Sequence, residues 1–145
     1  MSAIVIDTNV WISGFLFGGM PEKVLRYCAE ASSIRIFRSE SLRKEFVRHI
    51  YHEKFTERLN KLELDPKRLC RAFLDATVDV EALSLSINDV PLLQDQDDLH
   101  VLSLAFAVRA DCIITGDKKH LLPLHPFRSI PIITPAQFWK ERIHE

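Results

Sequence analysis

Four acidic residues spread along the chain are the side chains best suited to chemistry: Asp7, Glu45, Asp98 and Asp117. Two carboxylates about 4 Å apart repel each other by roughly 4 kcal/mol at an effective dielectric near 20. Four that converge must therefore take up protons or hold a cation. Because hard oxygen ligands of this kind favour Mg²⁺ or Mn²⁺, the four acids predict a divalent-metal site if the fold brings them together.

Each acid also has an ordinary structural explanation. An aspartate such as Asp7 or Asp117 often hydrogen-bonds the backbone of its own turn. An aspartate at a helix N-terminus, such as Asp98, caps the helix, and a cap alone is worth roughly 0.5 to 2 kcal/mol. Glu45 could be a solvated helix residue, but it stands just ahead of Phe46, close to the apolar stripe of its helix.

The sequence pattern predicts that strands and helices alternate along the chain, and these elements would position the four acids. Short apolar runs indicate buried parallel strands, and the helical segments carry apolar residues at a spacing of three to four. Strands are expected at residues 3–6, 34–37, 112–114 and 130–133, with a weaker candidate at 78–83. Helices are expected at residues 10–17 and 21–31, which Gly18 and Gly19 separate, and at 40–50, 66–74, 98–108 and 135–139, while the stretch 84–96 is irregular.

This order predicts an α/β fold, a three-layer α/β/α sandwich around a central, mainly parallel sheet of four to five strands. The length predicts a single domain over residues 1–145, and 47% hydrophobic residues are enough for its core. Parallel sheets bind ligands beyond the carboxyl ends of their strands. Asp7 and Asp117 follow two such strands, and Glu45 and Asp98 lie near helix starts, so one edge could gather all four.

Charge and cysteine content narrow the setting. The net charge of −1 gives no overall attraction to nucleic acid or to an acidic membrane surface. Cys28, Cys70 and Cys112 lie far apart without a CxxC pair, so we expect reduced thiols in a cytoplasmic protein. Residues 1–7 predict a strand rather than a signal peptide, and no apolar run approaches the roughly 18 residues of a membrane span.

Four segments of the sequence resemble the PIN domain family, which contains metal-dependent ribonucleases and VapC-type toxins. They are IVIDTNVWISGF, SLRKEFVRHIYHEKF, DQDDLHVLSLA and DCIITGDKKHLL. Each is a weak pattern alone, but their order and spacing cover essentially the whole chain and make a strong one together. The TGD sequence with the closing TPAQFW is similar to a PIN subgroup of toxin components of toxin–antitoxin pairs.

The resemblance implies an activity and roles for individual residues. The activity is hydrolysis of RNA phosphodiester bonds with Mg²⁺ or Mn²⁺ as cofactor. Asn9 and Thr115 match polar positions that orient the carboxylates. The implied partners are RNA, a cognate antitoxin protein and, in a homodimer, a second copy of the chain, with no membrane. The catalytic metal ligands fall on Asp7, Glu45, Asp98 and Asp117.

Three aspartates, Asp95, Asp97 and Asp98, are candidates for the third ligand position. We expect Asp98, because the apolar residues of the helix that follows then fall on its buried side. Leu99-His100 departs from the family, where a polar and then a basic residue would stand. This departure concerns phosphate contacts near the site rather than metal binding.

Basic residues flank two of the acids and would suit contacts to RNA phosphates, although a solvated charged surface is the alternative. No HExxH motif or Cys/His ligand set is present, so neither zinc nor a catalytic histidine is expected. His120, three residues after Asp117, is the best-placed histidine. The expected substrate contacts are Arg43, Lys118 and Lys119, within a wider basic set of Arg35, Arg38, Lys44 and Arg48.

Two other functions remain open on the sequence. A Mg²⁺-dependent phosphatase that forms an aspartyl phosphate also uses an aspartate after its first strand, but it needs a second acid two residues later, where this chain has Asn9. A non-catalytic PIN-like module would keep the fold and bind protein or RNA. Phe15, Leu16 and Phe17 could contact a partner or a second copy, or be buried in the domain's own core.

Overall fold

One parallel sheet forms the centre of the molecule. The computed structural model describes residues 2–90, 92–93 and 96–143. Within these residues the sheet has five strands in the order β3-β2-β1-β4-β5, and every neighbouring pair is parallel. The strands are β1 Ser2–Ile6, β2 Ile34–Arg38, β3 Thr77–Asp79, β4 Cys112–Ile114 and β5 Ile132–Ile133. The predicted α/β fold with a parallel sheet is confirmed.

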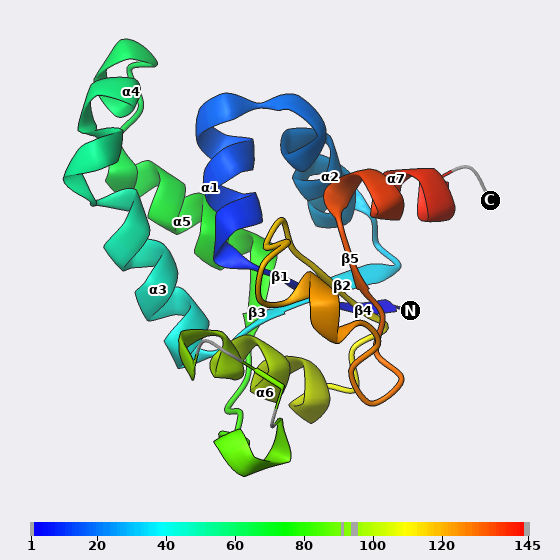
Figure 1. Cartoon of the computed structure of the whole chain (residues 1–145). Helices are drawn as coiled ribbons and strands as arrows, with labels where there is room; N and C mark the ends of the chain where they lie inside the picture. Colours follow the sequence, from blue (N-terminus) through cyan, green and yellow to red (C-terminus); the bar gives the residue numbers. More distant parts are fainter. Residues whose placement is uncertain (1, 91, 94–95, 144–145) are drawn as a thin grey trace.

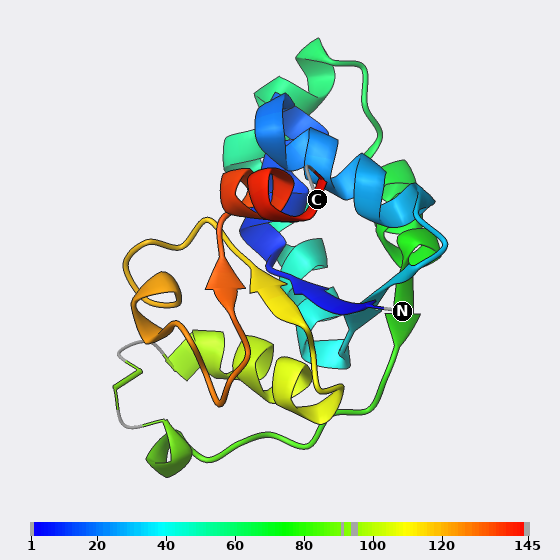
Figure 2. The ribbon, with the colours of Figure 1, turned by 90° about the vertical axis from the view of Figure 1, so that its right-hand side faces the viewer.

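Helices cover both faces of this sheet and make the three predicted layers. Figure 1 traces their order along the chain, and Figure 2 shows α1, α2 and α7 above the strands with α6 below them. The α-helices are α1 Thr8–Phe17, α2 Gly19–Glu30, α3 Glu40–Ile50, α4 Thr56–Lys61, α5 Pro66–Ala76, α6 Leu99–Ala107 and α7 Pro135–Ile143. Short 3₁₀ turns are η1 Glu53–Phe55, η2 Ile87–Asp89, η3 Gln96–Asp98 and η4 Leu122–Leu124.

The strand order contains a switch point between β1 and β4. From β1 the chain adds β2 and β3 on one side, and then returns to place β4 and β5 on the other. Residues Ile4 to Ile6 of β1 are at most 1% exposed, as expected for a central parallel strand. Ligand sites of open parallel sheets lie beyond the strand ends at such a switch point.

Local sequence signals explain where several helices start. Ser39 Oγ accepts a hydrogen bond from the Leu42 amide at 3.2 Å, and Asp65 Oδ1 accepts one from the Lys67 amide at 2.9 Å. Both contacts satisfy backbone donors that a helix N-terminus leaves free. The predicted break between the first two helices is confirmed, because Gly18 adopts φ +69°, which ends α1.

Two strands differ from their predicted bounds. The candidate at residues 78–83 is the short β3, which ends at Asp79 because its partner β2 ends at Arg38. The last strand begins at Ile132 rather than residue 130, because Pro131 has no amide to donate and Ile130 pairs with Phe127 instead. The sequence also contained no recognised signal for α4.

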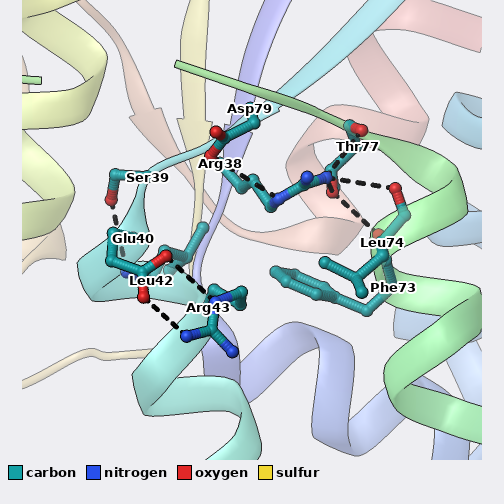
Figure 3. A network of polar contacts seen from close by, with 9 residues as sticks. All are labelled: Arg38, Ser39, Glu40, Leu42, Arg43, Phe73, Leu74, Thr77 and Asp79. Atoms are coloured by element: carbon teal, nitrogen blue, oxygen red, sulfur yellow. Dashed lines mark hydrogen bonds and ion pairs between the residues drawn. The ribbon is translucent and has the colours of Figure 1, made fainter. Parts of the chain in front are cut away.

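Arg38 serves the fold rather than a phosphate. Its Nη1 donates to the Leu74 carbonyl, the Thr77 carbonyl and Thr77 Oγ1 at 3.1, 2.9 and 2.7 Å, and its side chain is 16% exposed. Figure 3 shows this guanidinium joining the end of β2 to the end of α5 and the start of β3. Arg38, expected among the phosphate-binding cations, is therefore engaged in structural contacts.

The three cysteines and the Phe15–Phe17 segment have defined places in the fold. Cys28, Cys70 and Cys112 form no disulfide. Leu16 is 1% exposed and belongs to the core, Phe15 is partly buried, and Phe17 is 57% exposed, so only Phe17 clearly offers surface to a partner. Among the residues described, none of the helices has the length and apolar character needed to cross a membrane.

Candidate metal centre

Asp7 and Thr115 meet because they follow neighbouring strands. Ile6 of β1 is in register with Ile114 of β4, and the Asp7 amide donates to the Ile114 carbonyl at 2.9 Å. The residue after each strand therefore lies at the same edge of the sheet. Thr115 Oγ1 donates to Asp7 Oδ2 at 2.8 Å across a sequence separation of 108 residues.

The Asp7 carboxylate is buried, with only 4% of the residue exposed. Its Oδ1 accepts from the Thr8 amide at 2.8 Å, and its Oδ2 also accepts from Asn9 Nδ2 at 3.1 Å. Burial raises the pKa of Asp7 from 3.8 to about 6; the hydrogen bond from Thr115 opposes this rise, and the charge of Glu45 adds to it. A cation beside Asp7 would offset the free-energy cost of burying its negative charge.

Asp117 belongs to the same hydrogen-bond network through the turn after β4. Thr115 Oγ1 accepts from the Asp117 amide at 3.0 Å, and Asn9 Oδ1 accepts from the Gly116 amide at 3.1 Å. The Asp117 carboxylate is partly buried, and its Oδ1 accepts from the amides of Lys119 and His120 at 3.1 and 3.0 Å. These bonds link the first and last of the four acids.

Replacing Thr115 with valine should test this link. The change removes the hydroxyl that donates to Asp7 and accepts from the Asp117 amide, while it keeps a similar shape at a fully buried position. Loss of bonds to buried polar groups predicts a fall of about 1–3 kcal/mol in the free energy of unfolding. Urea denaturation measures it. Thr115→Ser, which keeps the hydroxyl, is the control and should lose only about 1 kcal/mol for the missing methyl group.

Glu45 lies on α3 and contacts α6 through His100. The two side chains are 14% and 17% exposed, and His100 Nε2 lies 3.0 Å from Glu45 Oε2. Partial burial pushes the pKa of Glu45 upward, but the hydrogen bond from His100, the nearby Thr8 hydroxyl and the charges of His100 and His49 together hold it below its ordinary value. Glu45 is therefore charged at neutral pH and close enough to act on Asp7.

His100 is the residue that sequence reasoning missed. The sequence drew attention to His120, whose backbone amide, not its ring, contacts Asp117. The available signal was position: His100 stands two residues after Asp98, in the first turn of α6. Since α6 packs against both β1 and α3, a polar side chain in that turn comes near Glu45.

Asp98 stands at the start of α6, where η3 ends, and its side chain is partly buried, whereas Asp97 is exposed. Asp95, the remaining candidate for the third ligand, lies outside the described residues. Among the residues that are described, no three His, Cys, Asp or Glu side chains lie close enough together to hold a metal ion. Asp98 or Asp117 would have to approach Asp7 and Glu45 to complete such a site.

The donor set nevertheless fits a hard divalent cation. Asp7 and Glu45 supply carboxylate oxygens, which Mg²⁺ and Mn²⁺ prefer as ligands. The burial of Asp7 raises its pKa, so the charged carboxylate would be stabilised by a bound cation. Carboxylates that repel one another without a cation have reason to stay apart until one binds. The assignment of Asp7, Glu45, Asp98 and Asp117 as metal ligands stays a prediction.

The expected substrate contacts occupy different surroundings. Arg43 makes a two-point contact with Glu40, with Nε–Oε2 and Nη2–Oε1 distances of 3.0 and 2.5 Å, as Figure 3 shows. Both side chains are exposed enough for an RNA phosphate to compete. Lys118 and Lys119 are exposed in the turn that follows Asp117. All three assignments stay predictions.

The protein is an α/β domain in which carboxylates follow parallel strands at one edge of the sheet. The family profile of the PIN domain matches residues 3–119, and the chain belongs to this family. No curated protein sequence matches the chain.

A solved structure shares the fold. It is the crystal structure of VapBC2 from Rickettsia felis bound to a DNA fragment from their promoter, one chain of which superposes with a TM-score of 0.61. The match covers 91% of this chain and 98% of that one at 14% sequence identity. At this identity the likeness concerns the fold.

Proposed function

We propose that this protein is a ribonuclease that hydrolyses RNA phosphodiester bonds with Mg²⁺ or Mn²⁺. The observation that carries the proposal is the Asp7 carboxylate, which is buried beside Glu45 and has its pKa raised to about 6. None of its hydrogen bonds from the described residues comes from a lysine or arginine. A buried carboxylate without a positive partner lowers the stability of the fold. A site that binds a cation nevertheless needs such a carboxylate.

In this proposal the residues divide the work by their place in the network. Asp7 is the central ligand, and Thr115 and Asn9 fix the direction of its oxygens. Asp98 and Asp117 complete the ligand set, while Glu45 holds a second ion or accepts a proton from the attacking water. The chemistry supplied by the bound cation is a lower pKa for that water and stabilisation of charge on the phosphate.

Two features weigh against the alternatives. The phosphatase needs an acid two residues after Asp7, but Asn9 stands there and uses both ends of its amide, as donor to Asp7 and acceptor from Gly116. A non-catalytic module would have no use for a carboxylate whose burial raises its pKa. Release of phosphate from a small phosphomonoester without RNA cleavage would favour the phosphatase, and tight RNA binding without cleavage would favour the module.

We also propose that the protein is the toxin of a toxin–antitoxin pair, with a small antitoxin as its partner. Support comes from the shared fold with a chain of the VapBC2 complex. A hollow of about 590 Å³ beside Phe17, lined largely by apolar residues such as Trp11 and Leu25, offers surface to such a partner. Growth arrest on expression, relieved by a co-expressed upstream reading frame, would support this role.

Exchanging single acids at the start of α6 tests the ribonuclease. With a mixed RNA pool and Mn²⁺, Asp98→Asn should lower the cleavage rate at least about 100-fold, because a ligand is lost. Asp97→Asn is the matched control, since it changes the neighbouring, exposed aspartate and should cleave within about twofold of the wild type. Equal activity of both variants would remove Asp98 from the site, and no metal-dependent cleavage by the wild type would contradict the proposed function.

A further inference from the structure

A cavity at the far end of α6 has no part in the carboxylate site. It has a volume of about 510 Å³ and lies between the C-terminal end of α6 and the loop before β5. Figure 2 shows that loop, in orange, beside α6. Phe106 comes eight positions after Asp98, so the cavity is about 12 Å along the helix from Asp98 at a rise of 1.5 Å per residue. Its side-chain lining includes Phe106, Arg109 and Arg128.

The lining combines positive charge with an aromatic ring. Phe106 is 45% exposed, although it is large and apolar. The guanidinium of Arg128 lies over the Phe106 ring at 4.7 Å from its centroid, and over Phe127 at 5.3 Å. Of the described residues that line the cavity, none is acidic. The nearest ion-pair contact of Arg128 is with Asp89 at 4.0 Å, which is long and exposed enough to compete poorly with a ligand.

Both arginines of the cavity have a positive φ, a backbone conformation that residues other than glycine rarely adopt. Phe127 and Ile130 exchange two backbone hydrogen bonds of 2.9 and 2.8 Å, so Arg128 and Ser129 form the two-residue turn of a hairpin. Both have positive φ, +48° and +69°, which such turns usually give to Asn and Gly. Arg109 has φ +51° just after α6. Non-glycine residues held in such sparsely populated conformations cluster at ligand-binding and active sites.

We propose that this cavity binds a nucleotide of single-stranded RNA, with its base stacked on the Phe106–Arg128 pair and its phosphate against Arg109. Aromatic rings and arginine planes are the surfaces on which unpaired bases stack, and adjacent cations hold the backbone. This inference rests on the proposed function, because it gives that RNA a second point of attachment. The site then holds the strand a short distance from the bond that is cleaved.

Binding of a labelled single-stranded oligoribonucleotide to the full chain, with EDTA present so that no cleavage occurs, tests the site. Phe106→Leu should raise Kd by roughly 5- to 100-fold, the effect of losing one stacked base. Phe17→Leu is the matched control, because Phe17 is also exposed, at 57% against 45% for Phe106, and has Arg58 over its ring at 5.0 Å. The control should bind within about twofold of the wild type.

The remaining outcomes separate the base from the charge and this site from the nuclease. An oligonucleotide without bases should bind wild type and Phe106→Leu equally, whereas an equal loss on both ligands would overturn base stacking. In cleavage, Phe106→Leu should raise KM and leave kcat unchanged, because it is remote from the acids. If Phe106→Leu and Phe17→Leu bind RNA alike, the site is refuted. RNA binding that depends on Phe106 without any cleavage would refute the nuclease alone.

Discussion

Replacing Asp7 with asparagine should abolish RNA cleavage while the protein stays folded. The amide keeps the size of the carboxylate at a position that is 4% exposed, but it removes the charge that holds a cation. It also presents an NH₂ group where Oδ2 now accepts from Thr115 and Asn9. A cation that stabilises charge at the phosphate is worth several kcal/mol, so we expect a fall in kcat of at least about 100-fold.

The measurement is single-turnover cleavage of a defined RNA with saturating Mn²⁺, together with circular dichroism to verify the fold. Asp75→Asn is the control, because Asp75 is an exposed acid on α5 that pairs with Arg71 and, among the described residues, has no contact with the network around Asp7. That variant should cleave like the wild type. Full activity of a folded Asp7→Asn protein would remove Asp7 from the mechanism, and with it the central assignment of the site.

The second large effect is on stability as a function of pH without divalent metal. Asp7 has a pKa of about 6 in the folded protein against 3.8 as a free side chain. Since the folded state holds the proton more tightly, this group contributes its stability at low pH and loses it as the pH rises through 6. A shift of this size corresponds to a loss of about 3 kcal/mol between roughly pH 4 and pH 7.

Urea denaturation at a series of pH values with EDTA measures this loss. Other groups titrate over the same range, so the readout is the difference between wild type and Asp7→Asn. Between pH 4 and pH 7, the wild type should lose up to about 3 kcal/mol of unfolding free energy relative to Asp7→Asn, which has no carboxyl group to ionise at this position. Mg²⁺ or Mn²⁺ at pH 7 should restore stability to the wild type only, since binding to the folded state stabilises it. Parallel profiles of the two proteins would show that Asp7 carries no unusual pKa.

Much of the fold could be predicted from local patterns. Buried runs such as Ile4–Ile6 in β1 and caps such as Ser39 and Asp65 are decided by neighbouring residues, so their elements lie where expected. Apart from the unexpected α4, the errors fall at the margins of the sheet. There β3 is as short as its partner allows, and β5 starts two residues later than expected, after Pro131, so pairing rather than propensity decides the bounds.

The candidate site was also predictable from the sequence only in part. Its four acids stood out in the sequence by their types and by their places next to strands and helix starts. The contact between His100 and Glu45 could not be read there, because it joins two helices whose packing angle and spacing no local pattern contains. The structural use of Arg38 was hidden for the same reason, since its acceptors come from α5 and β3.

The amino-acid sequence was enough to locate most of the helices and strands and the carboxylates that follow them, although not α4. The neighbouring positions of β1 and β4 depend on how the whole chain packs, and this pairing brings Thr115 to Asp7 across a sequence separation of 108 residues. The same packing also decided the burial that raises the pKa of Asp7, because desolvation depends on every element packed around a group. The type of a residue determines which chemistry its side chain can do. The groups packed around that side chain determine its protonation state.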